Sequence, residues 1–70
     1  MDAKKFGKKV KIARIEQDMT QDQLAEAIQT KQKSISSYET GAAFPSLGTL
    51  EKLAHILKKP ISYFFDEPLP

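Results

Sequence analysis

The chain has 70 residues, of which 40% are hydrophobic, and it carries a formal net charge of +2 at pH 7 with no cysteine. That length suits one small domain, and no apolar run approaches the roughly 18 residues of a membrane span, so we expect a cytoplasmic protein without a membrane segment or signal peptide. The lack of cysteine excludes disulfides and thiolate metal sites, and the single histidine, His55, cannot hold zinc unaided, so we expect neither a metal nor a cofactor.

The positive charge is concentrated near the start of the chain, where six basic residues precede Glu16: Lys4, Lys5, Lys8, Lys9, Lys11 and Arg14. Such asymmetry favours a polyanionic partner, although a solvated lysine-rich helix explains the charges equally well. A core of this size gives only marginal stability, which favours packing against a second copy or a larger chain.

Two helices are predicted in the first part of the chain. Hydrophobic residues recur at helical spacing between Lys4 and about Gln17, namely Phe6, Val10 and Ala13, with Ile12 and Ile15 beside them. A second helix is predicted from about Gln21 to Ile28, because Thr20 and Gln23 match the capping-box pattern. Its buried face is formed by Leu24, Ala25 and Ile28.

A third helix is predicted from near Lys31 to near Thr40. Ile35 and Tyr38 share one side of it, and Gly41 is suited to the left-handed conformation that ends many helices. The other side of this helix is polar, which is unusual for a helix that only packs in a core.

The last part of the chain predicts a loop, a fourth helix and a short fifth one. Ser46 can cap the fourth helix, whose apolar stripe is Leu47, Leu50, Leu53, Ala54 and Leu57. Pro60 stops it and suits the first turn of a fifth helix through Ile61, Phe64 and Phe65, with both phenylalanines in the core. Residues 66–70 (DEPLP) are expected to be a tail or the start of a linker. With no repeat and no strand pattern, the predicted fold class is all-α, with five short helices in one domain over residues 1–70 and a core at about 6–65.

An ordered set of these residues matches a known family. The set is Thr20, Gln21, Leu24, Ala25, Ile28, Ile35, Tyr38, Glu39, Gly41, Pro45, Ser46, Leu50 and Ala54. It resembles the lambda-repressor-like helix-turn-helix domains of the Cro and xenobiotic-response-element type, and the resemblance covers roughly residues 6 to 65. It implies that the second and third helices form the helix-turn-helix.

Two positions depart from the family's pattern, because glycine is usual where this chain has Gln29 and Lys58. At the first position the family's turn needs a positive φ angle, where a residue with a Cβ atom costs on the order of 1 kcal/mol, and Lys58 has a similar implication. We therefore expect local strain at both positions and no loss of DNA contacts.

The resemblance implies that the third helix lies in the major groove of double-stranded DNA. By position, the base-reading residues are Gln32, Lys33 and Ser37, supported by Lys31 and Ser36. Gln32 can pair with adenine and Lys33 with guanine, whereas Ser37 is too promiscuous to assign. The residues expected to contact phosphates are Thr20, Gln21 and Thr40.

Other residues receive structural roles from the same resemblance. Arg14 and Glu39 are expected to form an ion pair that joins the first helix to the end of the third. A homodimer is expected to pair through Pro60, Ile61 and Tyr63. His55 is expected on the surface, without a metal.

The leading functional hypothesis is a sequence-specific DNA-binding transcriptional regulator, a repressor that binds a palindromic operator as a dimer, of prokaryotic, phage or mobile-element origin. The alternative is a protein-interaction module of a coactivator, or the N-terminal domain of a larger ligand-sensing regulator. The polar outer side of the third helix favours DNA, because a protein-docking surface needs an apolar anchor. An enzyme is not expected, since no nucleophile lies beside a base and no glycine-rich phosphate loop is present.

Overall fold

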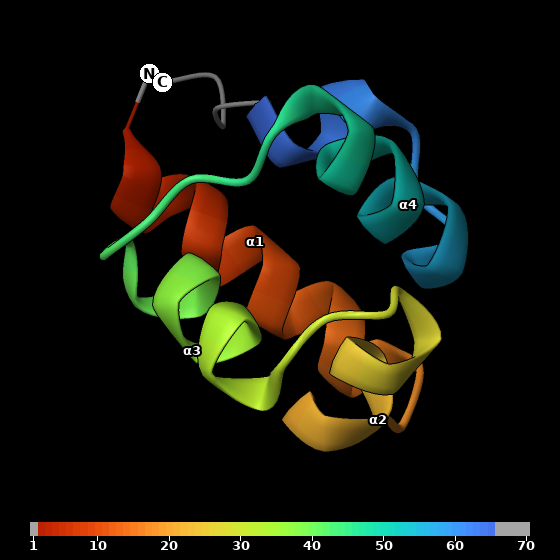
Figure 1. Cartoon of the computed structure of the whole chain (residues 1–70). Coiled ribbons are helices and arrows are strands. Elements are labelled where there is room, and N and C mark those ends of the chain that lie inside the picture. Colours follow the sequence, from red (N-terminus) through yellow and green to blue (C-terminus); the bar gives the residue numbers. More distant parts are fainter. Residues whose placement is uncertain (1, 66–70) are drawn as a thin grey trace.

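The computed structural model describes residues 2–65, which contain four α-helices and a terminal 3-10 helix. The elements are α1 (Ala3–Glu16), α2 (Gln21–Ala27), α3 (Gln32–Thr40), α4 (Leu47–Leu57) and η1 (Ile61–Phe65). Figure 1 shows α1 running through the middle of the molecule, with α3 and α4 on opposite sides of it. The predicted all-α class is confirmed, while the predicted tail at residues 66–70 lies outside the described residues.

The short fifth helix predicted after Pro60 is a 3-10 helix over residues 61–65, so the structure has four α-helices. The amide of Tyr63 donates to the carbonyl of Pro60 at 3.0 Å, which is the i to i+3 bonding of that tighter helix. A five-residue segment directly after a proline is too short to establish the longer-range bonds of an α-helix.

The N-terminus of α1 has a cap that the sequence pattern did not predict. The Asp2 carboxylate accepts hydrogen bonds from the amides of Lys4 at 2.9 Å and Lys5 at 3.4 Å, so α1 begins one residue earlier than expected. These bonds, the Lys4 amide first, favour the charged form and hold the pKa of Asp2 below its usual range.

The start of α2 has the predicted capping box. The Thr20 hydroxyl accepts from the Gln23 amide at 3.0 Å, and the Gln23 side chain accepts from the Thr20 amide at 2.8 Å. The helix ends at Ala27, with Ile28 as its C-cap, and α3 begins at Gln32 with Lys31 as its N-cap. Both predicted boundaries therefore move by one residue.

The two positions that lack the family's glycine do adopt left-handed backbone. Gln29 has φ 60° in the turn between α2 and α3, and Lys58 has φ 60° at the end of α4. Gly41, with φ 82°, ends α3 as predicted. Asp18 also has a positive φ, of 55°, which the sequence pattern did not indicate.

The core consists of the apolar faces of all five elements and includes Phe6, Val10, Leu24, Ile35, Leu53, Leu57 and Phe64. Two of the predicted apolar positions are exposed. Leu47, predicted in the apolar stripe of α4, is 67% exposed at the first position of that helix, and Phe65, predicted in the core, is 37% exposed. The Phe65 ring instead lies on the surface, with its centroid 5.8 Å from that of Phe6.

The contact between α1 and α3 depends on Gly7, which is buried. A Cβ atom at this position would lie 2.5 Å from the carbonyl oxygens of Tyr38 and Glu39. Only glycine permits this approach, which places the buried end of α3 directly against α1.

Candidate nucleic-acid interface

The helix α3 separates a buried side from a polar outer side. Ile35 and Glu39 are buried against the rest of the domain. Of the predicted base-reading and supporting residues, Lys31, Gln32 and Lys33 are exposed, and Ser36 and Ser37 are half-buried. The outer side of α3 thus presents mainly hydrogen-bonding groups, and the exposed Phe44 lies in the loop that follows it.

The position of α3 is secured by a bidentate ion pair between Arg14 and Glu39. The Nε atom of Arg14 lies 2.6 Å from Oε2 of Glu39, and its Nη2 lies 3.1 Å from Oε1. The two side chains are only 11% and 3% exposed, and Nη1 of Arg14 also donates to the carbonyl of Met19 at 2.7 Å. This arrangement ties α1, α3 and the segment before α2 together.

A second chain of hydrogen bonds leads from that ion pair to the first residue of α3. The Nε2 group of Gln21 donates to Oε1 of Glu39 at 3.0 Å, and Nε2 of Gln32 donates to Oε1 of Gln21 at 2.5 Å. Gln32 is therefore held by a partner that is itself anchored to a buried carboxylate. Because this hydrogen bond already restricts the Gln32 side chain in the free protein, the side chain would lose less conformational entropy when it binds a base.

Sequence reasoning missed this role of Gln21, to which it gave a phosphate contact alone. A glutamine amide has two N–H donors, so the one that does not bond Glu39 is still available to a phosphate. The burial of Glu39 explains the contact, because a buried carboxylate has more acceptor sites than one arginine fills and so calls for another donor nearby.

The remaining outer residues lie together beside α3. A shallow hollow of about 330 Å³ is lined by Lys31, Lys33, Ser34, Ser37, Tyr38, Ala43 and Phe44. Gln32 and Ser36 are not part of its lining. The predicted base-reading and supporting residues therefore form two groups. Gln32 is hydrogen-bonded to Gln21, whereas Lys31, Lys33 and Ser37 line the hollow.

The two predicted phosphate-contacting threonines already make local hydrogen bonds. The Thr20 hydroxyl accepts from the Gln23 amide, and the Thr40 hydroxyl donates to the carbonyl of Ser37 at 3.3 Å. Both residues are exposed. The Thr20 hydroxyl keeps its own proton for a phosphate, whereas Thr40 would have to exchange a bond.

The residues predicted for dimer contacts lie in η1 or directly before it. Pro60 is exposed and Ile61 is 37% exposed. Tyr63 is half-buried, and the ammonium groups of Lys9 and Lys59 each lie 4.8 Å from the centre of its ring. Cation–π contacts of this kind leave less of the ring for a partner than the sequence suggested.

Other kinds of site find no support within residues 2–65. His55 is exposed, as expected, and the described residues contain no group of three or more metal-ligating side chains that could hold an ion. None of the helices in this range has the length and apolar character needed to cross a membrane.

Three features define the class of the domain: the capped α2, the left-handed turn at Gln29, and α3 with a polar outer side held against α1. Together they define a helix-turn-helix DNA-binding domain of the kind found in transcriptional regulators. The chain belongs to the helix-turn-helix family, whose family model matches residues 10–64.

Similar proteins include regulators of several kinds. The cryptic phage CTXphi transcriptional repressor RstR of Vibrio cholerae is 35% identical over 57 residues, which cover 81% of this chain and 51% of that protein. The chain thus spans about half the length of this curated relative.

Solved structures agree on the fold. Bacillus thuringiensis PlcR, in complex with the peptide PapR7 and DNA, gives a TM-score of 0.83 at 38% identity, covering 90% of this chain and 22% of PlcR. The restriction-modification controller protein C.AhdI from Aeromonas hydrophila gives a TM-score of 0.86 at 26% identity, covering 91% of this chain and 97% of C.AhdI.

Proposed function

We propose that this chain is a transcriptional repressor that binds a palindromic operator in double-stranded DNA as a homodimer, with one α3 in each of two major grooves. The likeness to a phage transcriptional repressor and to PlcR, whose structure was solved in complex with DNA, supports the proposal. The protein would act in the cytoplasm, on the DNA of a prokaryote, a phage or a mobile element, and it would have no catalytic role.

The observation that carries the proposal is the hydrogen bond between Gln32 and Gln21. Gln32 is exposed at the start of α3, yet its orientation is set by a partner anchored on the buried Glu39. The bond uses one N–H of Gln32 and leaves its carbonyl and second N–H for another molecule. These two groups complement N6 and N7 of adenine.

The lysine group completes the proposed interface. Lys33 would donate to guanine, and Lys31, Ser36 and Ser37 would support it from the same helix. Thr20, Gln21 and Thr40 would contact phosphates and set the register of the domain on the duplex. The loop of residues 41–46 has no basic side chain, so we expect a shallow dependence of affinity on salt.

The proposed homodimer uses Pro60, Ile61 and Tyr63. Ile61 offers an exposed apolar side chain beside the rigid ring of Pro60. The ammonium groups of Lys9 and Lys59 cover Tyr63, so its contribution would be through the edge of the ring. A dimer with a twofold axis here would present two α3 helices to one side of the duplex.

The test is selection of bound duplexes from a random library, followed by fluorescence anisotropy on the selected operator. We expect an inverted repeat with half-site centres about 10 base pairs apart, and a loss of about 1 to 3 kcal/mol in binding for Gln32→Ala. The control is an operator in which the contacted adenine is replaced, on which Gln32→Ala should have no further effect. If no motif is enriched, α3 does not read bases and the protein-interaction alternative gains instead.

A further inference from the structure

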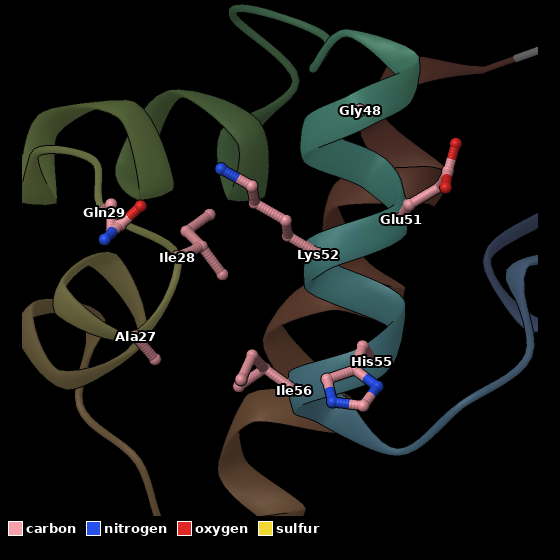
Figure 2. Close-up of a pocket in the computed structure, with 8 residues that line it drawn as sticks. All are labelled: Ala27, Ile28, Gln29, Gly48, Glu51, Lys52, His55 and Ile56. Carbon is pink, nitrogen blue, oxygen red and sulfur yellow. The ribbon is translucent and has the colours of Figure 1, made fainter.

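A second hollow lies away from the proposed DNA-contacting residues, between the end of α2 and α4. Figure 2 shows this α2–α4 groove, which has a volume of about 500 Å³. Its lining consists of Ala27, Ile28, Gln29, Gly48, Glu51, Lys52, His55 and Ile56. None of these residues has a role in the proposed DNA interface, and the groove is at the opposite end of α2 from Thr20 and Gln21.

Gly48 lies on the edge of the groove without an evident role in the fold. It is the second residue of α4, and glycine is the poorest helix former after proline. A Cβ atom at this position would meet nothing within 4 Å, and its φ is not in the left-handed region. One physical reason for glycine at such a place is the close approach of a backbone from another molecule.

The lining of the groove includes aliphatic side chains together with two charged ones, Lys52 and Glu51. Figure 2 shows Lys52 extending from α4 toward Ile28 and Gln29, and Ile56 extending toward Ala27, whereas Glu51 and His55 point away from the end of α2. Within residues 2–65, Lys52 has no ion-pair or hydrogen-bond partner. An ammonium beside aliphatic groups complements a carboxylate that neighbours an apolar side chain.

The shape of the groove favours a polypeptide helix as the occupant. The groove follows α4 from Gly48 to Ile56, a rise of about 12 Å, or a little over two helical turns. It is open to solvent along one side, so it can cover one face of an elongated partner but cannot enclose a small ligand.

We propose that the α2–α4 groove docks an acidic amphipathic helix of a second protein. Apolar side chains of that helix would pack on Ile56 and Ala27, its backbone would approach Gly48, and a carboxylate would pair with Lys52. One wall of the groove is the turn directly before α3, so the partner binds next to the recognition helix without covering its outer side. This surface goes beyond the proposed repressor activity and does not depend on it.

The experiment uses the ¹⁵N-labelled chain and a synthetic peptide of about 15 residues, with leucines on one helical face and glutamates beside them. Two peptides serve as probes of specificity: a scrambled one of the same composition, and one with lysine in place of every glutamate. We expect saturable amide shifts confined to the groove residues, with a Kd of about 100 μM for the acidic amphipathic peptide alone.

Three variants locate the contact. Gly48→Gln places a longer side chain at the edge of the groove, at a position where its Cβ atom meets nothing within 4 Å. Lys52→Glu reverses the charge of the lysine. Each variant should weaken binding of the peptide by about tenfold. Lys8→Glu makes the same change in net charge on the exposed part of α1 and should have less than about a twofold effect. Amide spectra of the free variants establish that each is folded.

Several outcomes would overturn the proposal. These are shifts centred on α1 or α3, equal binding of the scrambled peptide, equal weakening by Lys8→Glu, or no saturable shift up to about 1 mM peptide. Shifts of the same amides when the chain alone is concentrated would identify a second copy as the occupant, which also contradicts a separate acidic partner.

Discussion

Replacing Arg14 by alanine removes the side chain that joins α1 to α3 and to the segment before α2. Three hydrogen bonds are lost, two to Glu39 and one to the carbonyl of Met19. The carboxylate of Glu39, which is 3% exposed, would keep the side-chain amide of Gln21 as its only hydrogen-bond partner among residues 2–65.

The expected magnitude follows from the burial of the pair. Removing one partner of a buried ion pair costs about 3 to 5 kcal/mol, because the other charge is left without compensation. A domain of 70 residues has a total stability of about 4 to 10 kcal/mol, so the variant should lose a large part of it. A loss of about 3 kcal/mol corresponds to a fall in Tm of about 12 to 24 °C for a domain of this size.

The assay is urea and thermal denaturation followed by circular dichroism. Glu39→Gln provides a milder variant and, together with Arg14→Met, measured alone and in combination with it, completes a double-mutant cycle that isolates the energy of the pair. Because neither residue contacts a base in the proposed complex, the ratio of affinities for the selected operator and a single-base variant of it should stay within about twofold of the parent. A change in Tm of less than about 4 °C for Arg14→Ala would refute the reasoning.

Three further predictions concern the backbone and its caps. Gln29→Gly should raise the free energy of unfolding by about 0.5 to 1 kcal/mol in urea denaturation, because it relieves the positive φ, whereas Gln29→Ala should give no such gain. Gly7→Ala should lower the free energy of unfolding by about 1 to 3 kcal/mol or more, because the new Cβ atom would lie 2.5 Å from carbonyl oxygens of α3. Gly48→Ala should be neutral or stabilising, because its Cβ atom meets no neighbour within 4 Å. If Gly48→Ala were the more destabilising of the two, the packing of α1 against α3 at Gly7 would be contradicted. The lowered pKa of Asp2 means that its charged form is favoured in the folded state, so its stabilisation is present above the unfolded pKa and is lost as the pH falls through the folded one. The difference in Tm between the parent and Asp2→Asn should therefore shrink between pH 6 and pH 3, and a constant difference would exclude this origin.

The sequence alone was sufficient for features that depend on neighbours within a few residues. The periodicity of apolar residues predicted four α-helices, and the spacing of Thr20 and Gln23 predicted the capping box. The family pattern also located the left-handed positions Gln29 and Lys58. The pairing of Arg14 with Glu39, which are 25 positions apart, is an exception, because it was predicted from the family resemblance and has no local signal. Helix periodicity, caps and turns are local properties of a chain, which is why a single sequence reveals them.

Other features were decided only by the way in which the helices meet. Leu47 fits the apolar stripe of its helix but has no neighbour to cover it, and Phe65 follows a buried Phe64 yet lies on the surface. Gly7 lies against the backbone of Tyr38 and Glu39, and Gln21 donates a hydrogen bond to Glu39. In each case the residues in contact are 18 or more positions apart in the sequence. Exposure and long-range hydrogen bonds depend on the angle and depth at which α1, α3 and α4 pack, and those quantities are set by the tertiary structure because no local pattern specifies them.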